Sequence, residues 1–345
     1  MTNSLRRTAP VLALAALLAA CGGEGGGTAA AVSLTGAGAT FPNPIYTQWF
    51  NAYNQATGAR INYQSIGSGG GIRQFTEGTV DFGATDGPMT EEQIAAVQGD
   101  VLHLPTVLGA VVLTYNLPGL SDTLTLDAEA IAGIYTGQIT RWNDPKLAAL
   151  NAGASLPDQQ IIVVHRSDGS GTTYIFSDYL AKVSPEWKER YGAGTSINWP
   201  VGLGGKGNEG VTQQVKQTVG AIGYVELIYA TSNGLSYAAV RNAAGNAVVP
   251  SLASVTAAAE QELGDSTDFR VSITNAPGAQ AYPIASFTWL LVKRSGLADS
   301  TKQAGLEAFL GWMIGPEAQR MAADLGYAPL PMPVIERVQR ELDAL

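Results

Sequence analysis

The sequence predicts an α/β protein of two domains, built on a mainly parallel sheet. Its 345 residues are enough for about two domains of ordinary size, and 46% apolar with 14% charged residues is typical of a well-cored chain. Strand-like and helix-like segments alternate from residue 33 to residue 120, as in β-α-β units. Two apolar segments, 107–116 and 283–293, are placed to carry the chain into a second domain and back.

The first domain is expected to alternate strands with helices. Strands are expected at 33–35, 61–66 and 80–85, and helices after residue 42, from residue 72 and after residue 90. Pro42 suits the first turn of a helix, where the missing N–H costs nothing. Thr90, with Gln93 three residues later, has the pattern of a capping box.

The second domain is expected to mix both kinds of element. Helices are expected at 125–150, 174–180, 211–218 and 251–263, and strands at 161–164 and 221–229. After the returning strand, residues 302–325 predict one amphipathic helix and residues 334–345 a shorter one.

The N-terminus has the pattern of a bacterial lipoprotein signal. Two arginines precede the apolar segment 11–20, which is too short to span a bilayer, and small residues lead into Cys21. We expect residues 1–20 to be removed and Cys21 to be lipidated, with the glycine-rich segment 21–32 as a flexible tether. The protein would then be exported and held at a membrane, in the periplasm or at the cell surface. A plain export peptide with an incidental cysteine is the alternative.

The charge and the cysteine count exclude several classes of function. The formal net charge of −9 becomes −11 once the two N-terminal arginines are removed, and the absence of a basic patch argues against nucleic-acid binding. One cysteine allows no internal disulfide, and no metal-binding spacing is present. His103 and His165 lie in apolar strand contexts and are expected to pack. We expect a monomer without metal or cofactor.

The segment 163–173 predicts an anion site. A buried strand ends beside Arg166, and small glycine, serine and threonine residues then lead into a helix. The first N–H groups of a helix lack partners and carry partial positive charge, and a guanidinium binds an oxyanion through two parallel donors.

Three more turns share this position between a strand and a helix. Thr40-Phe41, Ser68 and Asp86 each follow a strand of the first domain. Ligands of open α/β sheets bind at the carboxyl ends of strands, so these turns and that of Arg166 are expected to hold one ligand between the domains. Taken singly, such turns are usually structural, and Asp86 could merely cap a helix. The run 202–207 lacks Ser or Thr after its lysine and is interpreted as structural.

Five motifs stand in order between Ser33 and Leu330. They are 34–42, 67–71, 81–86, 166–172 and 199–208. In this order and spacing the chain resembles the phosphate-binding proteins of the bacterial high-affinity phosphate ABC importer. The resemblance implies the type II periplasmic binding protein fold, in which two α/β lobes with central mixed sheets are joined by a hinge. Lobe I would comprise 33–106 and 283–345, and lobe II 107–282.

The resemblance also implies the ligand contacts and the activity. The contacts would be Thr40, Phe41, Ser68, Asp86, Arg166, Ser170, Gly171 and Thr172. Phe41 and Gly171 would contribute backbone N–H groups, and Asp168 would pair with Arg166. The protein would capture inorganic phosphate and deliver it to the permease subunits of the importer, with no catalytic residue.

Asp86 would explain why phosphate is preferred to sulfate. Near neutral pH phosphate keeps at least one proton and can donate to a carboxylate, whereas sulfate would face it as a second acceptor of like charge. Another tetrahedral oxyanion, arsenate or sulfate, is the main alternative ligand. A secreted phosphatase with Ser170 or Thr172 as nucleophile would need a base or a metal, and strand alternation turns His165 away from Arg166. A surface adhesin or sensor on the same scaffold is a further alternative.

Overall fold

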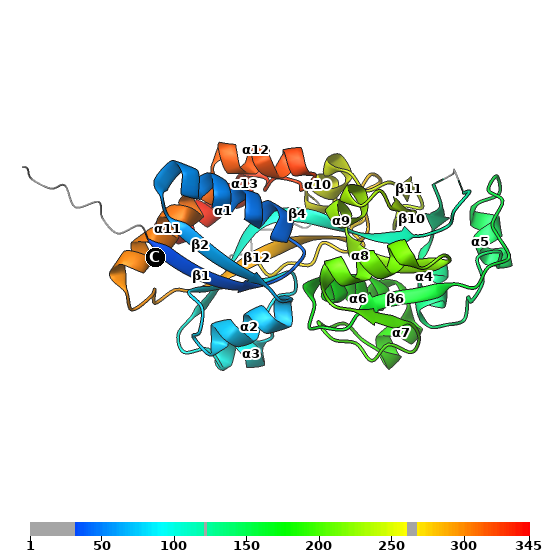
Figure 1. The fold of residues 1–345 in the computed structure, drawn as a ribbon, viewed down its shortest axis with the longest axis horizontal. Helices are drawn as coiled ribbons and strands as arrows, with labels where there is room; N and C mark the ends of the chain where they lie inside the picture. Colours follow the sequence, from blue (N-terminus) through cyan, green and yellow to red (C-terminus); the bar gives the residue numbers. More distant parts are fainter. Residues whose placement is uncertain (1–31, 121–122, 261–267) are drawn as a thin grey trace, which may run out of the picture. The chain divides into compact units, whose positions relative to one another are not determined.

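The computed structural model describes residues 32–120, 123–260 and 268–345 (Figure 1). The expected signal peptide 1–20, Cys21 and all of the expected tether except Val32 lie outside the described residues. The α/β class predicted from the sequence is confirmed, with helices on both sides of a central sheet.

The central sheet is mixed rather than mainly parallel. Its strands follow the order β2-β1-β3-β12-β4-β8-β6-β7, and β9 pairs with β4. Their bounds are β1 Ser33–Gly38, β2 Arg60–Ser65, β3 Phe82–Thr85, β4 Val101–Tyr115, β6 Ile162–Arg166, β7 Leu203–Gly205, β8 Ala221–Glu226, β9 Ser236–Tyr237 and β12 Ala285–Lys293. Strand β1 is parallel to β2 and β3, and β6 is parallel to β7 and β8. The returning strand β12 instead lies antiparallel between β3 and β4.

Strand β4 joins the two halves of the sheet (Figure 1). The first half contains β2, β1, β3 and β12, and the second half contains β8, β6 and β7. Its residues from Val101 to Ala110 pair with β12, and those from Val111 to Tyr115 pair with β8. Nearly every residue of β4 is buried, as expected of a strand covered on both faces. The predicted crossing strand is therefore longer than expected, and its partners change at Ala110–Val111.

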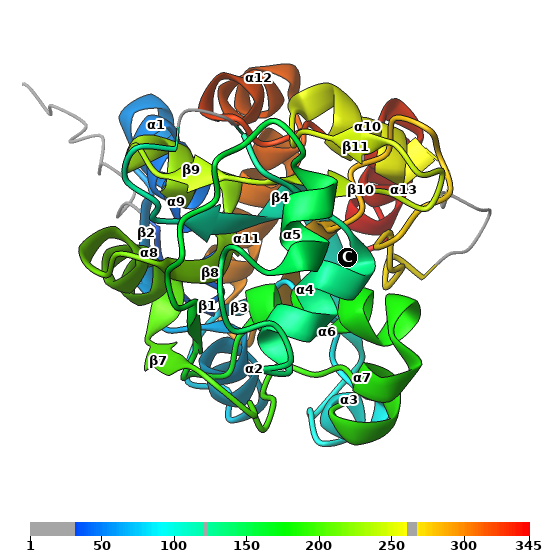
Figure 2. The same ribbon diagram turned by 90° about the vertical axis from the view of Figure 1, so that its right-hand side faces the viewer.

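Helices cover both faces of the first half of the sheet. They are α1 Asn43–Thr57, α2 Ser68–Thr76, α3 Glu91–Ala95, α11 Ser300–Met313, α12 Pro316–Leu325 and α13 Met332–Leu342. Helices α1 and α12 lie on one side of β1 and β2, and α2 and α3 lie on the other (Figures 1 and 2). The capping box predicted at Thr90 is present. The single helix predicted over 302–325 is wrong, because Gly315-Pro316 ends α11 and starts a new helix.

The second half carries further helices and a small second sheet. The helices are α4 Ala128–Tyr135, α5 Pro145–Leu150, α6 Gly171–Val183, α7 Pro185–Arg190, α8 Gly207–Gln217, α9 Leu227–Ser232 and α10 Leu252–Glu260, and the small sheet holds β5 Thr125–Leu126, β10 Ala239–Arg241 and β11 Ala247–Val248. Two expectations fail. Residues 125–126 pair as a strand, and 227–229 begin α9 because the Glu226 carboxylate caps the Ile228 N–H at 2.7 Å.

Candidate anion-binding site

Polar side chains from both halves of the sheet meet where their strands end. Thr40 follows β1, Ser68 begins α2 after β2, Asp86 follows β3 and Arg166 ends β6. All four are at most 3% exposed, and Phe41, Ser170 and Thr172 are fully buried. Buried polar groups need hydrogen-bond partners, which other protein groups or a ligand can supply. This cluster is therefore the candidate site.

Ser68 joins the two halves directly. Its Oγ accepts from the backbone N–H of Asp86 at 3.2 Å and from that of Gly171 at 3.0 Å. Nearby, the Gly69 N–H donates to the Gly169 carbonyl at 2.9 Å. A Cβ on Gly171 would lie 2.5 Å from Asp86 Oδ2, so glycine is required there by the close approach. The halves are therefore in contact around the site.

Arg166 is held flat by a bidentate ion pair with Asp168. The guanidinium Nε lies 2.8 Å from Asp168 Oδ1 and Nη2 lies 2.6 Å from Oδ2, and the arginine side chain is 1% exposed. Burial alone would raise the pKa of Asp168, but the hydrogen bonds and charge of Arg166 outweigh it and hold the pKa below its usual value. Nη1 remains directed to Thr172 Oγ1 at 3.3 Å.

Asp86 is the acceptor in a site made mostly of donors. Its Oδ1 accepts from Thr288 Oγ1 at 2.8 Å. Burial raises the pKa of Asp86 to about 7, although the hydrogen bond from Thr288, the charge of Arg166 and a hydrogen bond from Ser68 act in the opposite direction. Asp86 does not cap α3, whose cap is Thr90, so the interpretation as a helix cap is wrong. A carboxyl of this kind is present in both protonation states near neutral pH.

The N-terminus of α6 also lies in this region, and its Gly171 N–H is the one that donates to Ser68 Oγ. Ser170 is the N-cap, and its Oγ accepts from the Thr173 N–H at 3.0 Å. The Gly171 and Thr172 N–H groups precede the first intrahelical bonds, at the positive end of a helix of 13 residues. Tyr224 supports this turn, since its hydroxyl accepts from the Arg166 N–H at 3.1 Å and lies 2.6 Å from Thr173 Oγ1.

Tyrosines hold the loop after β1 by its carbonyl groups. The hydroxyl of Tyr229 donates to the Thr40 carbonyl at 2.5 Å, and that of Tyr327 donates to the Phe41 carbonyl at 2.7 Å. In a trans peptide the C=O and N–H groups point in opposite directions. Anchoring the Thr40 carbonyl therefore aims the Phe41 N–H away from Tyr229.

Sequence reasoning missed two residues of this network. Thr288 lies on β12, 202 positions from Asp86, and nothing local signals their contact. Asn208 is fully buried, and its Nδ2 lies 2.8 Å from Thr40 Oγ1 and 3.1 Å from Thr172 Oγ1. Asn208 is the last residue of the motif 199–208, whose glycine run was interpreted as structural. Its place in that motif is the feature of the sequence that could have indicated Asn208 as a site residue.

Comparison with known proteins decides the family. The PBP superfamily domain matches residues 24–317. A phosphate-binding protein PstS from Xylella fastidiosa (strain 9a5c) is 44% identical over 310 residues, which is 89% of this chain and 84% of the relative. Another from Pasteurella multocida is 44% identical over 316 residues and 91% of each chain. The chain belongs to the PstS family of phosphate-binding proteins.

Solved structures share the family's fold. A high affinity periplasmic phosphate-binding protein bound with phosphate superposes with a TM-score of 0.73 at 22% identity, covering 90% of this chain and 93% of the other. A phosphate-binding protein from Stenotrophomonas maltophilia gives 0.69 at 19% identity, covering 90% and 94%. The two-lobed type II fold expected from the resemblance is confirmed.

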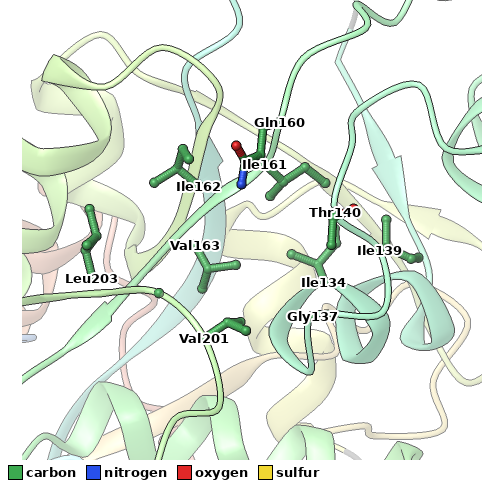
Figure 3. Close-up of a pocket in the computed structure, with 11 residues that line it drawn as sticks. Ile134, Gly137, Ile139, Thr140, Gln160, Ile161, Ile162, Val163, Val201 and Leu203 are labelled. Atoms are coloured by element: carbon green, nitrogen blue, oxygen red, sulfur yellow. The ribbon is translucent and has the colours of Figure 1, made fainter.

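An apolar hollow in the second half is a different kind of feature. It has a volume of about 330 Å³, and Figure 3 shows Ile134, Ile161, Val163, Val201 and Leu203 around it. No charged side chain lines it, so it offers an anion no counter-charge. The site of a PstS-family ligand is therefore to be sought at the strand ends and not in this hollow.

The histidines take no part in the site. His103 Nε2 accepts from the Met89 N–H at 3.1 Å, and burial lowers the pKa of His103 to about 4, so it stays neutral. His165 stacks on Trp199, with ring centroids 5.1 Å apart, and its Nδ1 lies 3.0 Å from the Arg166 carbonyl oxygen. Within the described ranges, no group of His, Cys, Asp and Glu is arranged to hold a metal ion, and none of the helices is long and apolar enough to cross a membrane.

Proposed function

We propose that this protein binds inorganic phosphate between its two lobes and delivers it to the permease subunits of a phosphate ABC importer. The observation that carries the proposal is the buried junction of both halves, where N–H and O–H donors lie beside Arg166 and beside Asp86, a carboxyl that is not paired with an arginine. Membership of a family whose relatives are named phosphate-binding proteins supports the same ligand.

The proposed contacts follow from this geometry. Arg166 offers Nη1, and α6 offers N–H groups at Gly171 and Thr172. The other proposed donors are the hydroxyls of Thr40, Ser68, Ser170 and Thr172 and the Phe41 N–H. Asp86 would accept the proton that phosphate keeps near neutral pH. Against sulfate it would leave two acceptors facing each other in a dry site, which favours phosphate.

Strand β4 is the proposed hinge. We place lobe I at 33–106 and 283–345 and lobe II at 107–282, and the change of partners at Ala110–Val111 supports a boundary within this strand. Since β4 is continuous across the boundary, opening would twist the strand rather than break it. The contact of Ser68 with Gly171 would be lost on opening.

Export and anchoring complete the proposal. Removal of residues 1–20 and lipidation of Cys21 would leave the domain tethered to a membrane, where a permease can be reached. We propose that the protein is a monomer. We also propose that it binds phosphate without chemical change, because the hydroxyls of Ser170 and Thr172 accept hydrogen bonds from neighbouring N–H groups and neither histidine contacts them. Replacing Cys21 with alanine should release the protein from the membrane fraction.

The decisive experiment is titration calorimetry on the form lacking residues 1–21. We expect tight one-to-one binding of phosphate, weaker or equal binding of arsenate and far weaker binding of sulfate. Sulfate binding as tightly as phosphate would refute the proposed ligand. Steady turnover of a chromogenic phosphate ester by the same preparation would instead indicate an enzyme.

A further inference from the structure

Asn208 lies between the two halves with every polar atom of its side chain engaged. It is the second residue of α8 and is fully buried. Its Oδ1 accepts from the Glu226 N–H at 3.0 Å, while Nδ2 lies 2.8 Å from Thr40 Oγ1 and 3.1 Å from Thr172 Oγ1. Its own backbone N–H also donates to Thr40 Oγ1, at 3.2 Å.

The orientation of the Asn208 amide is fixed by its neighbours. A backbone N–H can only donate, so the amide atom that faces Glu226 must be the oxygen. The amide nitrogen therefore faces the two threonine hydroxyls and donates one hydrogen to each.

This arrangement fixes what the threonine hydroxyls can do. Thr40 Oγ1 accepts from both nitrogens of Asn208, and Thr172 Oγ1 accepts from Asn208 Nδ2 and from Arg166 Nη1. A hydroxyl has two lone pairs and one proton, so each threonine keeps only its proton to offer. Among the described residues, neither hydroxyl donates a hydrogen bond to a protein acceptor.

We propose that Asn208 is a positioning residue that makes Thr40 and Thr172 obligate donors toward the bound anion. This inference rests on the proposed function of the same site. Thr40 follows β1 in one half and Thr172 lies on α6 in the other, so the arrangement is complete only when the lobes are closed. Asn208 thereby couples lobe closure to the orientation of both hydroxyls.

The consequence is a division of labour within the site. Hydroxyls that cannot accept favour the unprotonated oxygens of any tetrahedral oxyanion, which raises affinity without distinguishing phosphate from arsenate. The protonated oxygen cannot then donate to Thr40 or Thr172, whose hydroxyls have no lone pair left, and Asp86 is the charged acceptor that remains for it. A variant at Asn208 should therefore change affinity and leave the ratio of phosphate to arsenate binding unchanged.

A double-mutant cycle tests whether Asn208 acts through the threonines. The variants are Asn208→Ala, the pair Thr40→Val and Thr172→Val, and their combination, with phosphate affinity measured by calorimetry. We expect Asn208→Ala to lower affinity roughly 10- to 100-fold in the wild type, since two oriented hydrogen bonds are affected, and less than about threefold in the valine background. Equal losses in both backgrounds would overturn the inference.

Two further variants keep the test interpretable. Asn208→Asp preserves the shape of the side chain, but its ionised carboxylate would accept hydrogen bonds from both threonine hydroxyls, which would then no longer be available to the anion. Its phosphate affinity should fall further than that of the alanine variant at about pH 8 and recover as the introduced carboxyl is protonated at lower pH. A loss that does not recover on acidification would count against the inference. Asn242→Ala removes another buried asparagine, which donates to three backbone carbonyls elsewhere, and should leave phosphate affinity within about twofold.

Wild-type binding separates the two levels of the argument. If the wild type binds phosphate and the losses are additive, this inference alone fails. If the wild type does not bind phosphate, the proposed function fails and this inference fails with it.

Discussion

Replacing Asp86 with asparagine should convert the site from one that rejects sulfate to one that tolerates it. Asp86 is 1% exposed, and its Oδ1 is held by Thr288. The asparagine has nearly the same shape and can keep the bond from Thr288 with its oxygen. Its amide nitrogen then replaces Oδ2, the carboxylate oxygen nearest Gly171, and donates where the carboxylate accepted.

The gain for sulfate can be estimated from the charge that is removed. Two unit charges about 4 Å apart interact by roughly 4 kcal/mol at an effective dielectric constant of about 20. Counter-charges such as Arg166 and partial relaxation reduce this, so we expect sulfate to gain on the order of 2–4 kcal/mol, or about 30- to 1,000-fold in affinity.

Phosphate should lose less than sulfate gains. It loses a hydrogen bond to a charged group, worth about 1.5–3 kcal/mol, but it also escapes part of the same repulsion. We expect the phosphate affinity to fall about 10-fold or less at about pH 8. At this pH the wild-type carboxyl is mostly ionised, because its pKa, although raised by burial, is only about 7. Titration of both ions, with sulfate measured by displacement of phosphate, gives the selectivity ratio directly.

The matched control is Asp81→Asn. Asp81 is a second carboxylate of the first half, less deeply buried than Asp86, and it pairs with Lys302 and with Thr35 instead of facing the second half. That variant should keep the wild-type selectivity even if it is less stable. An Asp86→Asn protein that discriminates against sulfate as strongly as the wild type would refute the role given to Asp86.

Three further predictions concern charge, closure and pH. Arg166→Ala should lower phosphate affinity by several kcal/mol in calorimetry, because it removes charged donors and leaves a partly buried carboxylate unpaired, whereas Arg141→Ala removes an exposed ion pair and should change it by less than about 0.5 kcal/mol. Gly67→Ala would place a Cβ onto Asp168 Oδ2 across the closed lobes and should weaken binding at least about tenfold, while Gly58→Ala has a similar positive φ with nothing near it and should affect only thermal stability. In the wild type, sulfate affinity should rise as pH falls from about 9 to about 7 and level off below, because Asp86 is neutral below its raised pKa and can then donate to sulfate; Asp86→Asn should show no such dependence.

Local patterns predicted the elements whose causes are local. The capping box at Thr90 and the helix after Pro42 are present because each depends on residues within one or two turns. The break at Gly315-Pro316 also has a local cause, but the amphipathic pattern continues across it and by itself predicts one helix. The helices expected within 125–150 are present except at the start of that range, where residues 125–126 pair with β10, a partner more than one hundred residues away.

Site residues divide in the same way. Thr40, Ser68, Asp86 and Arg166 could be singled out because each stands where a strand gives way to a helix, a position that can be read from the sequence. From the sequence, their grouping was only an expectation. The pairing of strands that are distant in the chain is what places these four residues near one another. Thr288 could not be predicted, because only the antiparallel insertion of β12 beside β3 brings its hydroxyl to Asp86.

The sequence by itself determined the class of the fold, the family and the polar residues at the strand ends, because periodicity, turn chemistry and motif order are local properties of a chain. Tertiary structure decided the chemical state of those residues. Burial raises the pKa of Asp86 to about 7, and Asn208 turns two threonine hydroxyls into donors. Both effects arise from contacts between residues far apart in the chain, whose energy depends on which groups exclude water and which lone pairs are already filled.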